Sequence, residues 1–147
     1  MKTRTPKRSG QFKHILVPVD FSDQSLDALR MARSIAGGDP SRICVLHVDE
    51  PLHIDWRADT TAIQKEAHDV VRKVLVKFVR AEFGDDGPKT HFIVGKPVDG
   101  IVKFAGKMYA DLIVLGTQGR TGMPRVLIGS VAERVVRHAP CPVLVVR

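Results

Sequence analysis

The sequence predicts an α/β fold: a three-layer open sandwich in which a five-stranded parallel sheet carries helices on both faces. Short apolar runs alternate along the chain with segments of helical period, in the order β-α-β-α-β-α-β-α-β. The runs lack the polar alternation of a half-exposed strand, which favours strands buried on both faces of the sheet. The length of 147 residues suits one domain, and 44% apolar with 27% charged residues is the composition of a folded chain. We therefore expect one domain over residues 12–147, preceded by a basic tail over residues 1–11.

Runs rich in β-branched residues define the strands, and capping residues define the first helix. Ser22 is a favoured N-cap, and Asp23 places a negative charge in the first helical turn, where the helix dipole favours it. Gly37 and Gly38 then end that helix. The expected strands span residues 14–19, 43–48, 91–94, 112–115 and 143–146.

The longest expected helix begins at a capping-box pattern formed by Thr61 and Gln64 and ends between Gly84 and Pro88. Pro97 suits the first position of a third helix, and a fourth runs from about residue 129 to 138 before Pro140. In the longest helix the helical period predicts one continuous buried face. Its members are Ile63, Ala67, Val70, Val71, Val74, Leu75, Phe78 and Val79.

The charge pattern argues against a specific nucleic-acid partner. Of the formal net charge of +7, five charges lie in the first thirteen residues, so the remaining chain is close to neutral. The basic segment is expected to be a solubilising tail, with non-specific contact to phosphates or anionic lipid as the alternative. No apolar run reaches the length of a membrane span. Cys44 and Cys141 lie in apolar runs, which is typical of buried thiols in a reducing compartment, so we expect a cytoplasmic protein.

A glycine motif after the fourth strand is the strongest sign of a binding site. Ligands of open α/β sheets bind beyond the carboxyl ends of the strands, where the strand order reverses. There Gly116, Gly119, Gly129 and Ser130 form G-x2-G-x9-G-S, which leads into a helix. Such a loop can turn backbone N–H groups and a helix N-terminus toward a phosphate, and Arg120 lies within it. The alternative is that these glycines only make a tight turn.

Asp20 ends the first strand on the same side of the sheet. Its carboxylate could accept ribose hydroxyls or help to hold Mg²⁺, or it could instead support Ser22 at the start of the helix. If the glycines form a phosphate cradle, we expect Gly116→Val or Gly129→Val to abolish binding of the phosphate ligand and to leave the melting temperature close to that of wild type.

Several other site types lack their residues. The first strand–helix turn has no glycine, so the dinucleotide fingerprint is absent, and neither a P-loop nor a G-x-S-x-G elbow occurs. No C-x-x-C motif is present. A polar group after the second strand matches no metal motif, and we expect a solvated loop with one histidine at the edge of the core. The group comprises His47, Asp49, Glu50, His53 and Asp55.

Three separated segments resemble the universal stress protein family. They read HILVPVDFSDQS (14–25), VLHVDEP (45–51) and DLIVLGTQGRTGMPRVLIGSVAERVVRHAPCPVLVVR (111–147), and the resemblance runs from about residue 12 to 147. It implies the strand order 3-2-1-4-5. Because the sequence keeps G-x2-G-x9-G-S, it resembles the family branch that binds ATP. One departure is Gln118, where family members often carry histidine.

The resemblance also implies which residues hold the nucleotide. The ribose and adenine lie at the ends of the first two strands, and the phosphates lie against the glycine loop and the following helix. Mg²⁺ would be held through the nucleotide, with Asp20 beside it. The implied contacts are Pro18, Val19, Asp20, Val48, Leu115, Gly116, Gly119, Arg120, Gly129, Ser130 and Val131.

The resemblance implies a homodimer that pairs through the last strand, residues 143–146, which would cover an apolar edge. The alternative is that a neighbouring loop covers this edge. The expected function is that of a cytoplasmic, ATP-binding stress-response protein that acts as a nucleotide-dependent switch or protective factor. One alternative is a slow ATP hydrolase that uses Asp20, the only carboxylate expected near the phosphates. Another is a ligand-free interaction module.

Overall fold

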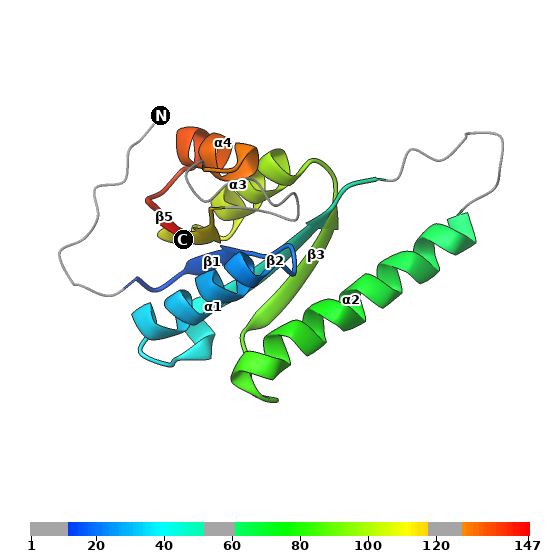
Figure 1. Cartoon of the computed structure of the whole chain (residues 1–147), viewed down its shortest axis with the longest axis horizontal. Helices are drawn as coiled ribbons and strands as arrows, with labels where there is room; N and C mark the ends of the chain where they lie inside the picture. The colour runs from blue at the N-terminus through cyan, green and yellow to red at the C-terminus, as the bar shows by residue number, and fades with distance from the viewer. Residues whose placement is uncertain (1–11, 52–60, 118–127) are drawn as a thin grey trace.

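The computed structural model describes residues 12–51, 61–117 and 128–147 of the chain (Figure 1). Their strands form one five-stranded sheet in the order β3-β2-β1-β4-β5, and every neighbouring pair is parallel. This confirms the predicted fold and strand order. The strands are β1 (Ile15–Pro18), β2 (Ile43–Asp49), β3 (Lys89–Val94), β4 (Leu112–Gly116) and β5 (Val143–Val146). The helices are α1 (Asp23–Ile35), α2 (Thr61–Phe83), α3 (Pro97–Lys107) and α4 (Ser130–His138), and a short 3-10 helix, η1, spans Pro40–Arg42.

The ends of α1 are those that the sequence predicts. The Ser22 hydroxyl accepts a hydrogen bond from the Ser25 N–H at 3.2 Å, and Asp23 lies in the first turn. Gly37 and Gly38 follow the helix with φ of 65° and 81°, a backbone conformation that glycine adopts without steric cost.

The sheet separates two apolar layers, because successive side chains of a strand point to opposite faces. Ile15 and Val17 of β1 pack in the layer that includes α1 and α2, whereas Leu16 packs in the layer that includes α3 and α4. All three side chains are fully buried. The central strand therefore anchors both layers of the three-layer sandwich.

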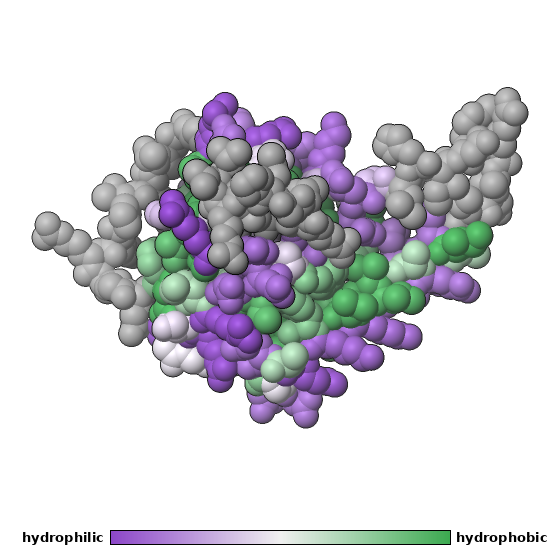
Figure 2. All heavy atoms as spheres, in the orientation of Figure 1, coloured by the Kyte–Doolittle hydropathy of each residue, from purple (hydrophilic) through white to green (hydrophobic). Residues whose placement is uncertain are grey.

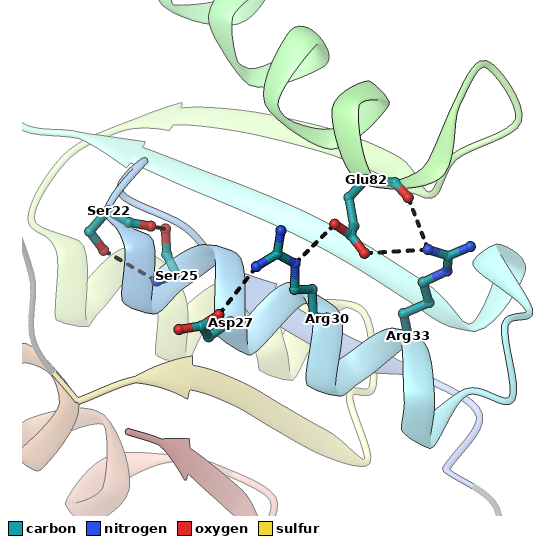
Figure 3. A network of polar contacts seen from close by, with 6 residues as sticks. All are labelled: Ser22, Ser25, Asp27, Arg30, Arg33 and Glu82. Atoms are coloured by element: carbon teal, nitrogen blue, oxygen red, sulfur yellow. Dashed lines mark hydrogen bonds and ion pairs between the residues drawn. The ribbon is translucent and has the colours of Figure 1, made fainter.

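Only the C-terminal half of α2 is anchored in the core. Leu75 and Val79 are its buried residues, so the prediction of one continuous buried face is wrong for the N-terminal half. Figure 1 shows that half running past the end of the sheet. At the other end, the Glu82 carboxylate accepts hydrogen bonds from Arg30 Nε at 3.1 Å and Arg33 Nη1 at 3.3 Å, which joins α2 to α1 (Figure 3).

A second connection joins segments far apart in the chain. The carboxylate of Asp111, just before β4, accepts the backbone N–H groups of Lys13 and His14, each at 2.9 Å. These groups precede β1, so Asp111 fixes the start of β1 beside the start of β4. The two strands are thereby joined at their amino ends, whereas the candidate site lies at their carboxyl ends.

Candidate functional site

The ladder between β1 and β4 ends early at the predicted site. β1 pairs with β2 from Ile15 to Pro18, but its register with β4 covers Ile15 and Leu16 alone. The N–H of Val19 donates to the Leu46 carbonyl at 2.8 Å, so by strand alternation the nitrogen of Pro18 faces β4. Because proline has no N–H, the ladder loses a donor on that side. This is the point where the strand order reverses, the position at which open α/β sheets bind ligands.

Two hydrogen bonds bring the ends of the glycine motif together at this point. Thr117, directly after β4, donates its N–H to the Val146 carbonyl at 2.9 Å, and its own carbonyl accepts the Gly129 N–H at 2.6 Å. Gly129 is the N-cap of α4, with φ −60° and ψ 154°. It has no side chain to cap the helix, so it contributes no acceptor for the N–H groups of the first turn, where Ser130 and Val131 are exposed.

The start of α1 lies at the same edge of the sheet and is closed by its own residues. Asp20 Oδ1 accepts the backbone N–H of Ser22 at 3.0 Å and also accepts the Ser22 hydroxyl. The Ser22 hydroxyl in turn caps Ser25 (Figure 3). Of the two hypotheses for Asp20, the structure therefore displays support of Ser22. Contact with ribose or Mg²⁺ stays a prediction.

Gly116 has a packing role that corrects one expectation. A Cβ at this position would lie 2.7 Å from the Cβ and 2.8 Å from the carbonyl carbon of Gln24, in the second residue of α1. The glycine therefore allows β4 and α1 to approach closely. The expectation that Gly116→Val would leave the melting temperature unchanged is wrong, because valine would push against the α1 backbone.

Two aromatic residues at the end of β1 and β2 were not among the predicted site residues. His47 is buried, and its Nδ1 lies 2.8 Å from the Val19 carbonyl oxygen, to which it donates. Phe21 has φ +67°, a conformation that costs a non-glycine residue about 1–3 kcal/mol. Its ring packs against His47, with centroids 4.5 Å apart, and against Phe78 of α2 at 5.6 Å. These contacts hold the strained turn between β1 and α1.

The sequence contains a signal for His47 but none for Phe21. The expectation of one histidine at the core edge is confirmed, and the position of His47 on the same side of β2 as Ile43 and Val45 indicates its face. A positive φ at Phe21 depends on the ring contacts, which involve residues distant in the chain.

The polar group beyond His47 extends to α2 without forming a metal cluster. The Asp49 carboxylate lies 4.0 Å from His47 Nε2 and 3.8 Å from His68 Nε2. Among residues 12–51, 61–117 and 128–147, no set of three His, Cys, Asp or Glu side chains could hold a metal ion. His53 and Asp55 lie outside these ranges.

Both cysteines are free thiols. Burial raises the pKa of Cys44 and of Cys141 to about 11, so both are protonated at neutral pH. They are therefore poor nucleophiles.

None of the helices within residues 12–51, 61–117 and 128–147 has the length and hydropathy that a membrane span requires.

The structure brings most of the predicted site residues to one edge of the sheet. Pro18, Val19 and Leu115 are buried there, whereas Asp20, Val48, Gly116 and Gly129 are partly exposed. Ser130 and Val131 are exposed at the start of α4. Gly119, Arg120 and Gln118 lie outside the described residues.

Comparisons with known proteins agree with this architecture. The sequence pattern of the universal stress protein family matches residues 11–147. The chain belongs to the universal stress protein family. A universal stress protein of Methanocaldococcus jannaschii is 38% identical over 149 residues, which cover 95% of this chain and 86% of that protein.

Two solved universal stress proteins share the fold over nearly their whole length. UspA from Lactobacillus plantarum has a TM-score of 0.73 and 31% identity, covering 93% of this chain and 99% of its own. A universal stress protein solved in complex with cAMP has a TM-score of 0.68 and 27% identity, covering 92% of this chain and 97% of its own. The family suggested by the three sequence segments is thus confirmed.

Proposed function

We propose that this universal stress protein binds an adenine nucleotide, with ATP as the ligand, at the carboxyl ends of β1 and β4. The observation that carries the proposal is the hydrogen bond from Gly129 to Thr117, which holds the start of α4 beside the end of β4. The first-turn N–H groups of α4 are donors for an anion, and the helix dipole adds to their attraction for phosphate.

The remaining contacts follow the same geometry. The ribose and adenine would lie along Pro18, Val19, Asp20 and Val48, and the phosphates along Leu115, Gly116 and residues 129–131. Gly119 and Arg120 belong to the proposed phosphate loop, and Mg²⁺ would enter with the nucleotide near Asp20. The solved relative in complex with cAMP supports an adenine ligand. ATP supplies the phosphate charges, and this chain supplies the donors.

Calorimetric titration of the nucleotide-stripped protein tests the proposal. We expect Mg-ATP to bind at micromolar concentration and GTP to give no heat. Gly129→Val should remove ATP binding. Gly106→Val is the matched control, because a Cβ at Gly106 in α3 meets nothing within 4 Å. Absence of heat from the folded wild-type protein would overturn the proposal and favour a ligand-free interaction module.

We further propose a homodimer that pairs β5 with its two-fold mate. β5 is an edge strand of the sheet, and Leu144 and Val146 expose apolar surface there. Leu144→Asp should convert the dimer to a monomer in sedimentation. A mass unchanged by this variant would count against the β5 interface.

The biological role that we propose is a nucleotide-dependent switch or protective factor in the stress response, located in the cytoplasm. The free thiols of Cys44 and Cys141 are typical of a reducing compartment. We propose binding without turnover, because the Asp20 carboxylate serves the Ser22 turn. Phosphate release equal to the buffer blank is expected; release lost in Asp20→Ala would favour the slow hydrolase instead.

A further inference from the structure

A stripe of exposed apolar residues runs along α2 from Ile63 to Val74. Ile63, Val70 and Val74 are 65%, 59% and 43% exposed, and Ala67 between them is exposed as well. We name these four residues the α2 stripe. Figure 2 shows hydrophobic atoms continuing along α2 to the end that projects from the sheet.

The α2 stripe is distinct from the face that packs on the sheet. Its spacing of four, three and four residues places its members on one side of the helix, about 130° from the core residues Leu75 and Val79 at ~100° per residue. The same spacing forms the seam between two packed helices, in which side chains of one helix insert between those of the other. Because the N-terminal half of α2 runs past the sheet, the strands cannot cover the stripe there (Figure 1).

We propose that the α2 stripe binds the α2 stripe of a second copy of this chain, with the two helices antiparallel. A two-fold axis between Ala67 and Val70 would place Ile63 opposite Val74 of the partner subunit. Ala67 would face Val70 of the partner subunit. Each layer then pairs a larger side chain with a smaller one, Ile with Val or Val with Ala. The small alanines let the two helices approach closely at the centre.

Charges beside the stripe favour this direction. Glu66 and Lys73 are both exposed and border the same side of the α2 stripe. In the antiparallel pair, Glu66 faces Lys73 of the partner subunit, and the two-fold axis repeats this ion pair. A parallel pair would instead place Glu66 beside Val71 of the partner subunit, where it gains no opposite charge.

This contact is separate from the proposed β5 dimer. α2 packs on β3, and β5 is the opposite edge of the sheet, so one copy can use both surfaces at once (Figure 1). Four residues bury less surface than the ~800 Å² that each partner buries in a standard stable interface. We therefore expect weak association that increases with protein concentration.

Sedimentation velocity of the full chain over a concentration series tests the proposal. We expect the mass to at least double at high concentration, because a monomer gives a dimer, whereas a β5 dimer presents two stripes and can grow further. Val70→Glu should raise the dissociation constant of this step at least tenfold. Val76→Glu is the control, because Val76 is 42% exposed but lies on another side of α2. Absence of doubling in wild type, or equal weakening by both variants, would overturn the proposal.

Charge reversal tests the antiparallel register. Glu66→Lys and Lys73→Glu should each weaken the association several-fold, because each places like charges opposite one another. The double variant should restore the wild-type value. A double variant as weak as the single ones would exclude this register. Repeating the series in Leu144→Asp distinguishes the two surfaces, since that variant changes only the starting species.

Discussion

Two helices begin at the candidate site, and their first turns differ. α1 is closed by its own side chains: Ser22 caps it, and Asp20 holds Ser22. α4 begins at Gly129, which has no side chain to offer, although its backbone is fixed by Thr117. Both starts are therefore well positioned, but among the described residues the start of α1 has a side-chain cap and that of α4 has none.

The comparison shows how one sheet edge can supply both rigidity and a binding surface. A capped helix start satisfies its donors within the chain and gains about 1 kcal/mol of stability. An uncapped start gives up that gain, and its donors become available to an anionic ligand.

The largest effect is expected when α4 is given the cap that α1 has. Gly129→Asp would place a carboxylate where we propose phosphate, so the affinity for ATP should fall by about 100-fold, or ~2.8 kcal/mol. The melting temperature should not fall, because aspartate is a favoured N-cap and suits the dipole. Calorimetry and thermal unfolding measure the two quantities. Gly129→Asn, which caps without charge, should lose less affinity; equal losses would argue against a phosphate at this position.

A smaller effect is expected from the contact between β4 and α1. Gly116→Ala should lower the free energy of unfolding by about 1–3 kcal/mol, because the added Cβ meets Gln24 at 2.7 Å. Urea unfolding measures it. Gly106→Ala, which meets no atom within 4 Å, should cost nothing, and a Gly116→Ala variant as stable as that control would show that α1 can move aside.

The turn before α1 should depend on His47. His47→Phe keeps an aromatic ring beside Phe21 but removes the donor to the Val19 carbonyl, at an expected cost of about 1.5 kcal/mol. His91→Phe, at an exposed position of β3, is the comparison and should change stability by less than about 0.5 kcal/mol. Equal unfolding midpoints for the two variants would show that the hydrogen bond from His47 to Val19 does not stabilise this turn.

The smallest effect is expected when α1 is made to resemble α4. Ser22→Ala should destabilise the protein by about 1 kcal/mol, because the Ser25 N–H loses its acceptor. ATP affinity should change little. Ser34→Ala, exposed near the other end of α1, is the control. A large loss of ATP affinity in Ser22→Ala would mean that the α1 start also contributes to the site.

Local signals in the sequence predicted the fold well. The Ser22 cap, the glycines after α1 and Pro97 at the start of α3 each act on neighbouring residues, and the structure has all three. Contacts between segments distant in the chain could not be predicted from the sequence. Nothing near Gly116 indicates that Gln24 lies against it, and nothing near Phe21 indicates the rings that hold its backbone.

The length of α2 explains why the expected buried face is wrong for its N-terminal half. Periodicity predicts which side of a helix is apolar, but not how much sheet is present to cover it. With 23 residues α2 is about 34 Å long. The six residues of β3 extend only about 20 Å. The same apolar periodicity therefore leads to a buried residue at Leu75, where the sheet covers the helix, and to an exposed one at Ile63, beyond the sheet.

The carboxylate of Asp111 that holds the start of β1 has a consequence for synthesis. It lies 97 residues after His14, and β4 follows it directly. While the chain is being made, β1 can pair with β2 but has no partner on its other side. At ordinary elongation rates this interval lasts roughly 5 to 20 seconds. The time for which β1 lacks this neighbour is thus set by the position of β4 along the chain, whatever the stability of the finished protein.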